Sequence, residues 1–281
     1  MIKLTECPRD AMQGIGRFIP TALKIKYINS LLKVGFDVID FGSFVSPKII
    51  PQLKDTVKVL SGLDLSSTNS KLLAIIANER GANEASMHDE ISILGFPFSV
   101  SEVFQLRNTK STREQSLETV KKIKEICDSS KKKLRVYLSM GFGNPYGEEY
   151  SVDIVLEWAW RLSQIGIEEL VLSDTIGVSN PSNIKPLFEL LLKELNTIEI
   201  SAHFHSAPNN WKEKIVSAYS AGCKSFDSTF KGLGGCPLAE DDLVGNLATE
   251  NLIDFFADQL SFKFDKDAFQ KAAVVSGEVF K

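Results

Sequence analysis

The stretch "IEISAHFH" (198–205) joins an apolar, β-branched run to two histidines, His203 and His205, at its far end. In a β-strand, residues two apart project from the same face, so both imidazoles would share one face where the strand ends. The "SAPNN" that follows, at 206–210, breaks the strand. Such a pair either holds a metal ion or consists of two ordinary hydrogen-bonded histidines, and the rest of the chain has to decide.

The same kind of short apolar run recurs along the whole chain. Eight are found: "IKLTE" (2–6), "FDVIDFG" (36–42), "KLLAIIA" (71–77), "EISILGF" (90–96), "LRVYLSM" (134–140), "EELVLSD" (168–174), "IEISAHF" (198–204) and "KSFDSTF" (224–230). Between them lie segments with helical spacing of apolar residues, clearest at 112–130, 152–166 and 183–196. Strands that alternate with helices indicate right-handed βαβ units and a parallel sheet.

Eight such units predict a (β/α)8 TIM barrel, and the 281 residues fit a barrel of roughly 250 residues. A doubly wound open sheet is the alternative, but no G-x-G-x-x-G follows the first strand, which weakens it. We expect residues 1–281 to form a single barrel domain with a short helical extension after about residue 257. The active site is then expected at the carboxyl ends of the strands.

Composition excludes several classes of function. The chain is 43% hydrophobic and 24% charged with a net charge of −4, so we expect no nucleic-acid partner and no membrane-surface partner. The four cysteines include no CxxC pair, which favours a reducing cytoplasm over a disulfide framework or a zinc knuckle. No signal peptide and no membrane-spanning run are recognised.

The strand exits carry the chemistry. Asp10 follows the first strand, His203 and His205 end the seventh, and Asn246 follows the eighth. In a closed barrel these side chains meet at one mouth. Two imidazoles, a carboxylate and an amide oxygen suit a divalent cation, with Mg²⁺ or Mn²⁺ preferred and Co²⁺ as a further candidate.

Six motifs in order carry a resemblance to a known family: "RDAMQ" (9–13), "SFVSPK" (43–48), "SDTIGV" (173–178), "HFH" (203–205), "GLGGCPLA" (232–239) and "GNLATEN" (245–251). Together they resemble 3-hydroxy-3-methylglutaryl-CoA lyase, a metal-dependent lyase on a TIM barrel. The similarity runs from the first strand to about residue 256. "GLGGCP" followed by "GN-ATE" is its most specific part.

The resemblance implies a role for each matching residue. Asp10, His203, His205 and Asn246 would bind the cation. Arg9 would stabilise the enolate oxygen that forms as the carbon–carbon bond breaks. Cys236, on a glycine-rich mobile loop, would transfer a proton.

Four more residues match family positions near the site. Asp40 stands where the family usually has the longer Glu, and we count it as a catalytic candidate that acts by supporting its neighbours. Gln13 and Asp174 would support the site or contact substrate. Glu250 would support Asn246 from the first turn of a helix.

Two departures from the family pattern concern the same region. Ser206 replaces the usual Asp after H-x-H, and "AEDDLV" (239–244) is acidic where the family has small residues and glycines. Neither removes a metal ligand. Contacts to CoA are not marked by any motif; Lys48, Arg107, Asn108 and Lys110 are candidates by position only.

The predicted function is cleavage of 3-hydroxy-3-methylglutaryl-CoA to acetyl-CoA and acetoacetate, with the acyl-CoA as small-molecule partner. The resemblance also implies a context in leucine degradation and ketone-body formation, and it leaves a homodimer open. Two enzyme alternatives are a Claisen-type synthase or aldolase and a lyase for another 3-hydroxyacyl-CoA. A non-catalytic barrel that acts as a binding module is the third alternative.

Overall fold

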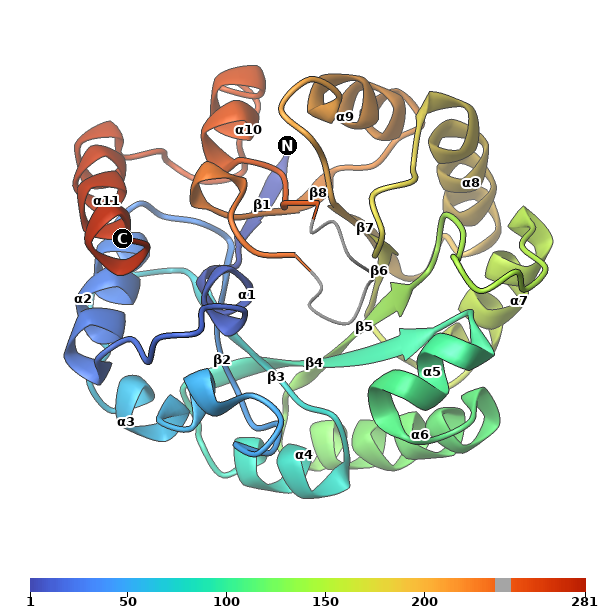
Figure 1. Ribbon diagram of the computed structural model, residues 1–281, viewed down its shortest axis with the longest axis horizontal. Coiled ribbons are helices and arrows are strands. Elements are labelled where there is room, and N and C mark those ends of the chain that lie inside the picture. Colours follow the sequence, from blue (N-terminus) through green and yellow to red (C-terminus); the bar gives the residue numbers. More distant parts are fainter. Residues whose placement is uncertain (236–243) are drawn as a thin grey trace.

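The computed structural model describes residues 1–235 and 244–281. Eight parallel strands close into a barrel, each paired with its neighbours in sequence and the last with the first (Figure 1). They are β1 (Lys3–Glu6), β2 (Val38–Ser43), β3 (Lys71–Ile75), β4 (Ile91–Ser99), β5 (Lys133–Ser139), β6 (Glu169–Asp174), β7 (Glu199–Phe204) and β8 (Ser225–Ser228). The predicted (β/α)8 barrel is confirmed.

Helices surround the barrel on its outside, except for the short first helix, which lies inside their ring (Figure 1). They are α1 (Pro8–Gln13), α2 (Thr21–Leu32), α3 (Thr56–Leu60), α4 (Glu79–Ser86), α5 (Glu102–Thr109), α6 (Arg113–Ser129), α7 (Val152–Ser163), α8 (Pro181–Glu194), α9 (Trp211–Ser220), α10 (Thr249–Phe255) and α11 (Lys266–Val279). Two 3₁₀ turns, η1 (Pro51–Leu53) and η2 (Phe230–Gly232), interrupt the loops.

The boundaries follow local capping and strand pairing. α6 begins after Thr112, whose side chain forms a capping box with Gln115. α8 begins earlier than its apolar pattern suggests because Asn180 caps it and Pro181 takes the first helical position. β4 continues past the expected end at residue 96 because its last residues stay paired with β5 as far as Ser139.

The interior of the barrel contains two kinds of side chain. One inner cluster is apolar and consists of Leu73, Ile75, Ile93, Tyr137 and Val171. The other is charged: Arg135 and Asp227 are fully buried and form an ion pair at 2.5 Å. A buried charge is tolerated only when paired and hydrogen-bonded, so the partners of these two residues matter for the site above them.

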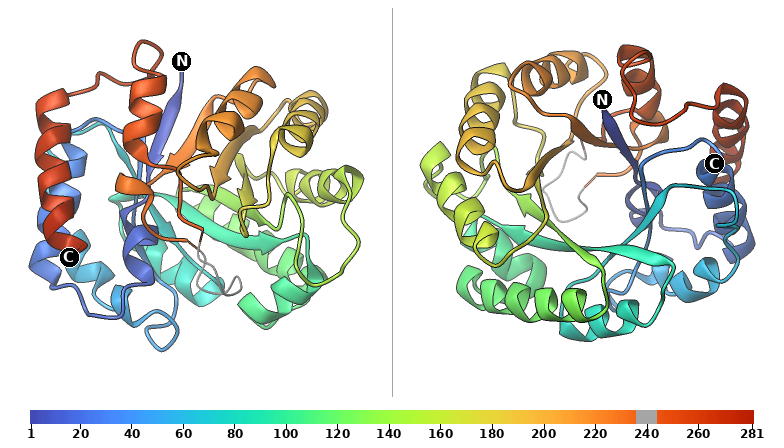
Figure 2. Two further views of the ribbon diagram at one scale, coloured as in Figure 1. Left: turned by 45° about the horizontal axis from the view of Figure 1, so that its top comes forward. Right: turned by 180° about the vertical axis from the view of Figure 1, so that it is seen from behind.

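The C-terminal helix α11 packs against α2, the second helix in the sequence (Figure 2). Aromatic contacts hold it there: the rings of Phe230 and Phe269 lie 4.8 Å apart, and those of Tyr27 and Phe280 lie 5.7 Å apart. Within the described residues, no helix is both long and apolar enough to cross a membrane.

Candidate active site

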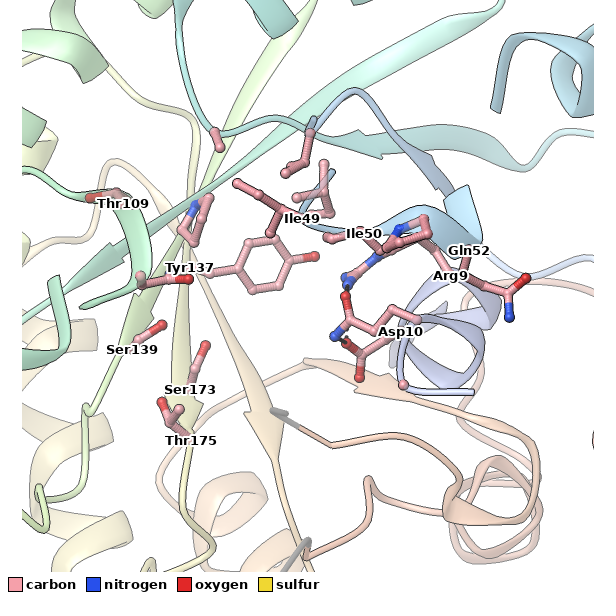
Figure 3. A pocket seen from close by; sticks show the side chains of 18 of the residues that line it. Arg9, Asp10, Ile49, Ile50, Gln52, Thr109, Tyr137, Ser139, Ser173 and Thr175 are labelled. Atoms are coloured by element: carbon pink, nitrogen blue, oxygen red, sulfur yellow. Dashed lines mark hydrogen bonds and ion pairs between the residues drawn. The ribbon is translucent and has the colours of Figure 1, made fainter. Parts of the chain in front are cut away.

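The carboxyl ends of the strands surround a pocket of about 690 Å³ (Figure 3). Its polar wall comes from strand exits: Arg9, Asp10, Gln13, Tyr137, Ser139, Ser173, Thr175, His203 and His205. Its apolar wall includes Val45, Ile49, Ile50, Ile75, Ala77, Pro97 and Phe104. The pocket therefore combines an apolar surface with a few converging polar groups, which is typical of a small-molecule site.

Arg9 and Asp10 enter the pocket from α1, which starts at Pro8 directly after β1. Proline suits the first helical position because its ring fixes φ and no N–H is lost there. The two side chains point toward one another in Figure 3, with Arg9 Nη1 3.0 Å from Asp10 Oδ1. The "RD" motif thus places a cation and an anion at the edge of the pocket.

Arg9 is held by three side chains. Its Nε and Nη2 donate to Asp40 Oδ2 at 3.0 and 2.5 Å, and Nη1 donates to Gln13 Oε1 at 2.8 Å as well as to Asp10. Burial opposes the positive charge, but Asp40 and Asp10 outweigh it and raise the pKa of Arg9 above its usual value. Asp40, the shorter residue at the family's Glu position, therefore lies against Arg9 and orients its guanidinium.

Asp10 is an ionised carboxylate. Gln13 Nε2 donates to its Oδ1 at 2.9 Å, and Asn246 Nδ2 donates to its Oδ2 at 2.7 Å. Burial raises the pKa of Asp10, but the charges of Arg9 and His203 lower it by more. The pKa of this carboxyl is therefore below its usual value.

His203 and His205 lie on the same face, with ring centroids 5.4 Å apart, and both line the pocket. His203 Nδ1 is 3.1 Å from Asp227 Oδ2, and His205 Nδ1 is 3.1 Å from the main-chain oxygen of Thr175. Both partners only accept hydrogen bonds, so each Nδ1 carries the proton. Each ring, in its neutral form, can then offer its Nε2 lone pair to a ligand.

The electrostatics of the two rings differ. Burial, followed by the charge of His203, lowers the pKa of His205 to about 4, so this ring is neutral at pH 7. Burial also acts on His203, but its hydrogen bond and ion pair with Asp227 prevail and raise the pKa of His203. His205 is thus a ready neutral donor, and His203 is the more basic of the two.

Comparison with known proteins identifies the family. The HMGL-like family model matches residues 3–268. This chain belongs to that family. It is 33% identical over 256 residues to hydroxymethylglutaryl-CoA lyase YngG of Bacillus subtilis, covering 91% of this chain and 84% of that protein. It is also 33% identical over 254 residues to the mitochondrial hydroxymethylglutaryl-CoA lyase of Bos taurus, covering 90% and 77% of the two chains.

Solved structures of HMGL-like lyases share the fold. The HMG-CoA lyase of Bacillus subtilis superposes with a TM-score of 0.91 at 30% identity, covering 100% of this chain and 94% of that one. The HMG-CoA lyase of Acinetobacter baumannii, in complex with coenzyme A and 3-methylmalate, has a TM-score of 0.90 at 29% identity and covers 99% and 91%.

The HMGL-like "GN-ATE" motif lies against the same group of residues. Asn246 is buried; its backbone bridges to that of His205, and its Nδ2 donates to Asp10 and to the main-chain oxygen of Leu233. Glu250 was expected to support Asn246, but its carboxylate accepts the main-chain N–H of Lys231 at 2.9 Å. Glu250, at the start of α10, therefore stabilises the η2 turn through this hydrogen bond.

Asp174 of the "SDTIG" motif lies behind the pocket and is not among its lining residues in the described part of the chain. Asp174 is fully buried and forms an ion pair with Lys214 at 2.8 Å. Its carboxylate also accepts hydrogen bonds from the main-chain N–H of Ser179 at 3.1 Å and from the Ser179 hydroxyl at 2.5 Å. The next residue, Thr175, does line the pocket. The motif therefore reaches the site through Thr175, and Asp174 holds the turn.

The donor set at the mouth fits a divalent cation. Asp10 supplies an ionised carboxylate, and the histidines supply two Nε2 lone pairs on the same pocket. Asn246 gives its Nδ2 to Asp10 and Leu233, so its Oδ1 is the atom left for a cation. A mixed oxygen and imidazole set of this kind suits Mg²⁺, Mn²⁺ or Co²⁺.

A different group of donors, which does not include Asp10 or His205, is close enough together to share an ion. Among the described residues, Cys7, His203 and Asp227 bring their donor atoms within 4.8 Å of one another. Asp227 already pairs with Arg135 at 2.5 Å, and the His203 nitrogen that faces it, Nδ1, carries a proton and has no lone pair for an ion. Burial and the charge of Asp227 raise the pKa of Cys7, which keeps the thiol protonated. This group therefore orients His203 and is a poor metal site.

Cys236 lies outside the described residues, as do the acidic positions up to 243. The residues on either side lie at the site. An added Cβ on Gly234 would be 2.8 Å from Asn246 Nδ2 and 3.0 Å from the main-chain oxygen of Asp10, and one added on Gly177 would be 3.0 Å from the side chain of Val244. Gly234 also has a φ of +94°, so close approach and backbone geometry both require glycine.

Sequence reasoning missed several residues. Asp227, Arg135 and Tyr137 lie inside strands and belong to none of the six motifs that carry the resemblance. Their signal was present: Arg135 and Tyr137 are two apart in an apolar run, hence on one face. The Tyr137 hydroxyl is buried without a hydrogen-bond partner among the described residues and points into the pocket (Figure 3). It is free to bind a substrate oxygen.

Of the four candidates for CoA contact, Asn108 lines the pocket. Arg107 lies over the ring of Tyr146 at 4.6 Å, and Lys48 is exposed. Lys110 ends α5 with a left-handed backbone. Position near a strand end does not by itself predict contact with CoA, because a charged side chain there can pair with other surface groups.

Proposed function

We propose that this chain cleaves 3-hydroxy-3-methylglutaryl-CoA to acetyl-CoA and acetoacetate in the pocket at the barrel mouth. The observation that carries the proposal is the convergence of Asp10, His203 and His205 on that pocket, with Nδ1 of both rings engaged from behind. Family membership and the named relatives support the reaction. The relative crystallised with coenzyme A supports an acyl-CoA as the substrate.

In this proposal Asp10, His203 and His205 hold a divalent cation, Mg²⁺ or Mn²⁺ in preference to Co²⁺, and Asn246 Oδ1 is the fourth protein ligand. When bound, the cation supplies a Lewis acid that lowers the pKa of the substrate hydroxyl. Asp227 fixes the tautomer of His203, and the Thr175 carbonyl fixes that of His205, as outer partners of metal-bound histidines commonly do.

Arg9 is assigned to the developing enolate. A guanidinium has five N–H groups, and in Arg9 the Nε–H, both Nη1–H and one Nη2–H have partners among the described residues. One Nη2–H is left for the thioester oxygen. When a base takes the hydroxyl proton, the electron pair of the O–H bond forms the ketone of acetoacetate, and the C2–C3 bond breaks. The electron pair of that bond passes to the thioester oxygen, where a donor already in place stabilises the charge.

Cys236 is assigned to protonation of the enolate carbon, and Tyr137 is well placed to donate to a substrate oxygen. We also propose that residues 1–281 act as one domain, since α11 packs on α2. The three described cysteines are free, which supports a cytoplasmic or other reducing compartment.

The test is a product assay. Purified protein with Mg²⁺ and 3-hydroxy-3-methylglutaryl-CoA is expected to release acetoacetate and acetyl-CoA in equal amounts, and EDTA is expected to stop the reaction. If the protein does not cleave this substrate, catalysis of the reverse condensation would favour a synthase or aldolase. Cleavage of another 3-hydroxyacyl-CoA would favour a related lyase. Absence of turnover with every acyl-CoA offered would favour a binding module.

Arg9→Met is expected to lower kcat by about 10²–10³, the cost of one lost donor to an oxyanion, while Mn²⁺ affinity stays close to wild type. The single variant leaves Asp40 buried without its partner, so the matched variant is Arg9→Met with Asp40→Asn, which removes both charges. Steady-state kinetics and Mn²⁺ titration are measured on both. Near wild-type turnover in either folded variant would contradict the role of Arg9.

A further inference from the structure

Lys214 is a buried cation that the proposed reaction does not use. It lies on α9, is 0% exposed, and is not one of the pocket-lining residues in the described part of the chain. Its Nζ donates to Asp174 Oδ2 at 2.8 Å, to the main-chain oxygen of His205 at 2.7 Å and to that of Gly177 at 3.1 Å. An ammonium has three N–H donors, and all three are used.

These bonds join two segments that carry site residues. His205 is the first residue after β7, while Asp174 ends β6 and Gly177 lies in the turn that follows. Asp174 also closes its own turn by accepting from the Ser179 main chain at 3.1 Å and from the Ser179 hydroxyl at 2.5 Å. Lys214 therefore fixes the end of β7 relative to a turn that is rigid in itself.

The orientation of the His205 ring depends on the same turn. Its Nδ1 lies 3.1 Å from the carbonyl oxygen of Thr175, the residue after Asp174. The His205 main chain is thus tied to the turn through Lys214, and its ring is tied to the turn through Thr175. Moving one segment against the other would therefore shift the ring of His205, which lines the pocket.

We propose that Lys214 is a positioning residue for His205, and that the Lys214–Asp174 pair sets the affinity of the barrel mouth for its divalent cation. The inference rests on the proposed function, since it requires His205 to be a ligand. Lys214 does not touch the reacting atoms; it acts through the His205 main chain and the Asp174 turn. Partners that orient a metal-bound histidine typically contribute 10- to 100-fold to metal affinity.

A purely structural role is the competing explanation, because breaking any buried pair destabilises a fold. The chain offers a matched control in Lys24 and Asp55, a second buried Lys–Asp pair at 2.6 Å. It joins α2 to the start of α3 and contacts none of the proposed ligands. Removing both charges of a pair avoids leaving one of them unpaired.

The experiment compares Lys214→Met/Asp174→Asn with Lys24→Met/Asp55→Asn and wild type, by Mn²⁺ dissociation constant from electron paramagnetic resonance and by thermal unfolding. The first double variant is expected to raise the Mn²⁺ dissociation constant by about 10- to 100-fold. The control is expected to change the unfolding midpoint but to leave the dissociation constant within about twofold.

Each result decides something. If wild type binds Mn²⁺ and both double variants bind it as tightly as wild type does, Lys214 is structural only and the inference is wrong. If wild type itself binds no Mn²⁺, it is the proposed metal site that fails. Should the Lys214 variant not fold, Ser179→Ala removes one bond from the same Asp174 carboxylate and is expected to weaken Mn²⁺ binding severalfold; an unchanged constant would overturn the inference.

Discussion

Asp10→Asn is expected to abolish measurable Mn²⁺ binding at micromolar protein and to lower kcat/KM by about 10³ or more. The substitution keeps the shape of the side chain and removes the one carboxylate in the proposed ligand set. A bound cation stabilises a transition state by several kcal/mol, and each 1.36 kcal/mol is tenfold in rate. The effect should exceed that of any single hydrogen bond around it.

The matched control is Gln13→Ala. Gln13 donates to Asp10 Oδ1 at 2.9 Å and accepts from Arg9, so its loss disturbs the same cluster without removing a ligand. Its kcat/KM is expected to fall by no more than about 10², since a hydrogen bond to a charged group contributes about 1.5–3 kcal/mol. If Asp10→Asn and Gln13→Ala lose activity equally and both bind Mn²⁺ as wild type does, Asp10 serves Arg9 and does not bind metal.

The fold was predictable because each of its signals is local. Eight short apolar runs, with helical patterns clearest at 112–130, 152–166 and 183–196, correspond to the eight strands of the barrel. Their ends shift by up to three residues for reasons that periodicity does not contain. β4 stays paired with β5 beyond its apolar run, and Pro181 starts α8 before the first apolar position of that helix.

The candidate site was predictable only in its outer part. Arg9, Asp10, His203 and His205 follow strand ends, and the carboxyl ends of parallel strands meet at one mouth. The residues that orient them are different in kind. Asp227 contacts His203 from within the neighbouring strand, and Lys214 reaches His205 from a helix.

These supporting contacts depend on register and on the rotation of a helix about its axis. A shift of one residue in β8 would turn Asp227 away from His203, and no local pattern specifies that alignment. In the sequence, Lys214 reads as one charge among three in "WKEK" (211–214). Only the packing of α9 on the barrel makes it a buried cation with three partners.

Cys236 differs from the other predicted site residues because the alkylation rate of its thiol can be measured directly. The other three thiols are buried, and burial raises the pKa of Cys127 and of Cys223 to about 12 and that of Cys7 well above its usual value. Thiolate is the reactive form, so iodoacetamide at pH 8 should modify Cys236 first.

Cys236→Ala is expected to keep the fold and the Mn²⁺ dissociation constant, to change KM by no more than severalfold, and to lower kcat by about 10²–10⁴, the usual contribution of a positioned proton donor. The reason is that the change removes a proton carrier and no ligand. Cys223→Ala, which removes a buried thiol away from the pocket, is the matched control and should retain kcat. Steady-state kinetics and Mn²⁺ titration are run on both.

Protection by substrate supplies the independent measurement. A Cβ added to Gly234 would lie 2.8 Å from Asn246 Nδ2 and 3.0 Å from the Asp10 main-chain oxygen, so the described chain just before Cys236 passes close to two proposed ligands. A bound acyl-CoA should therefore slow alkylation of Cys236 and leave the slow reaction of the other thiols unchanged. If substrate has no effect on the rate of alkylation, or if Cys236→Ala turns over as wild type does, the enolate takes its proton from another group, and the glycines around Cys236 serve only the turn that carries Gly234 past Asp10.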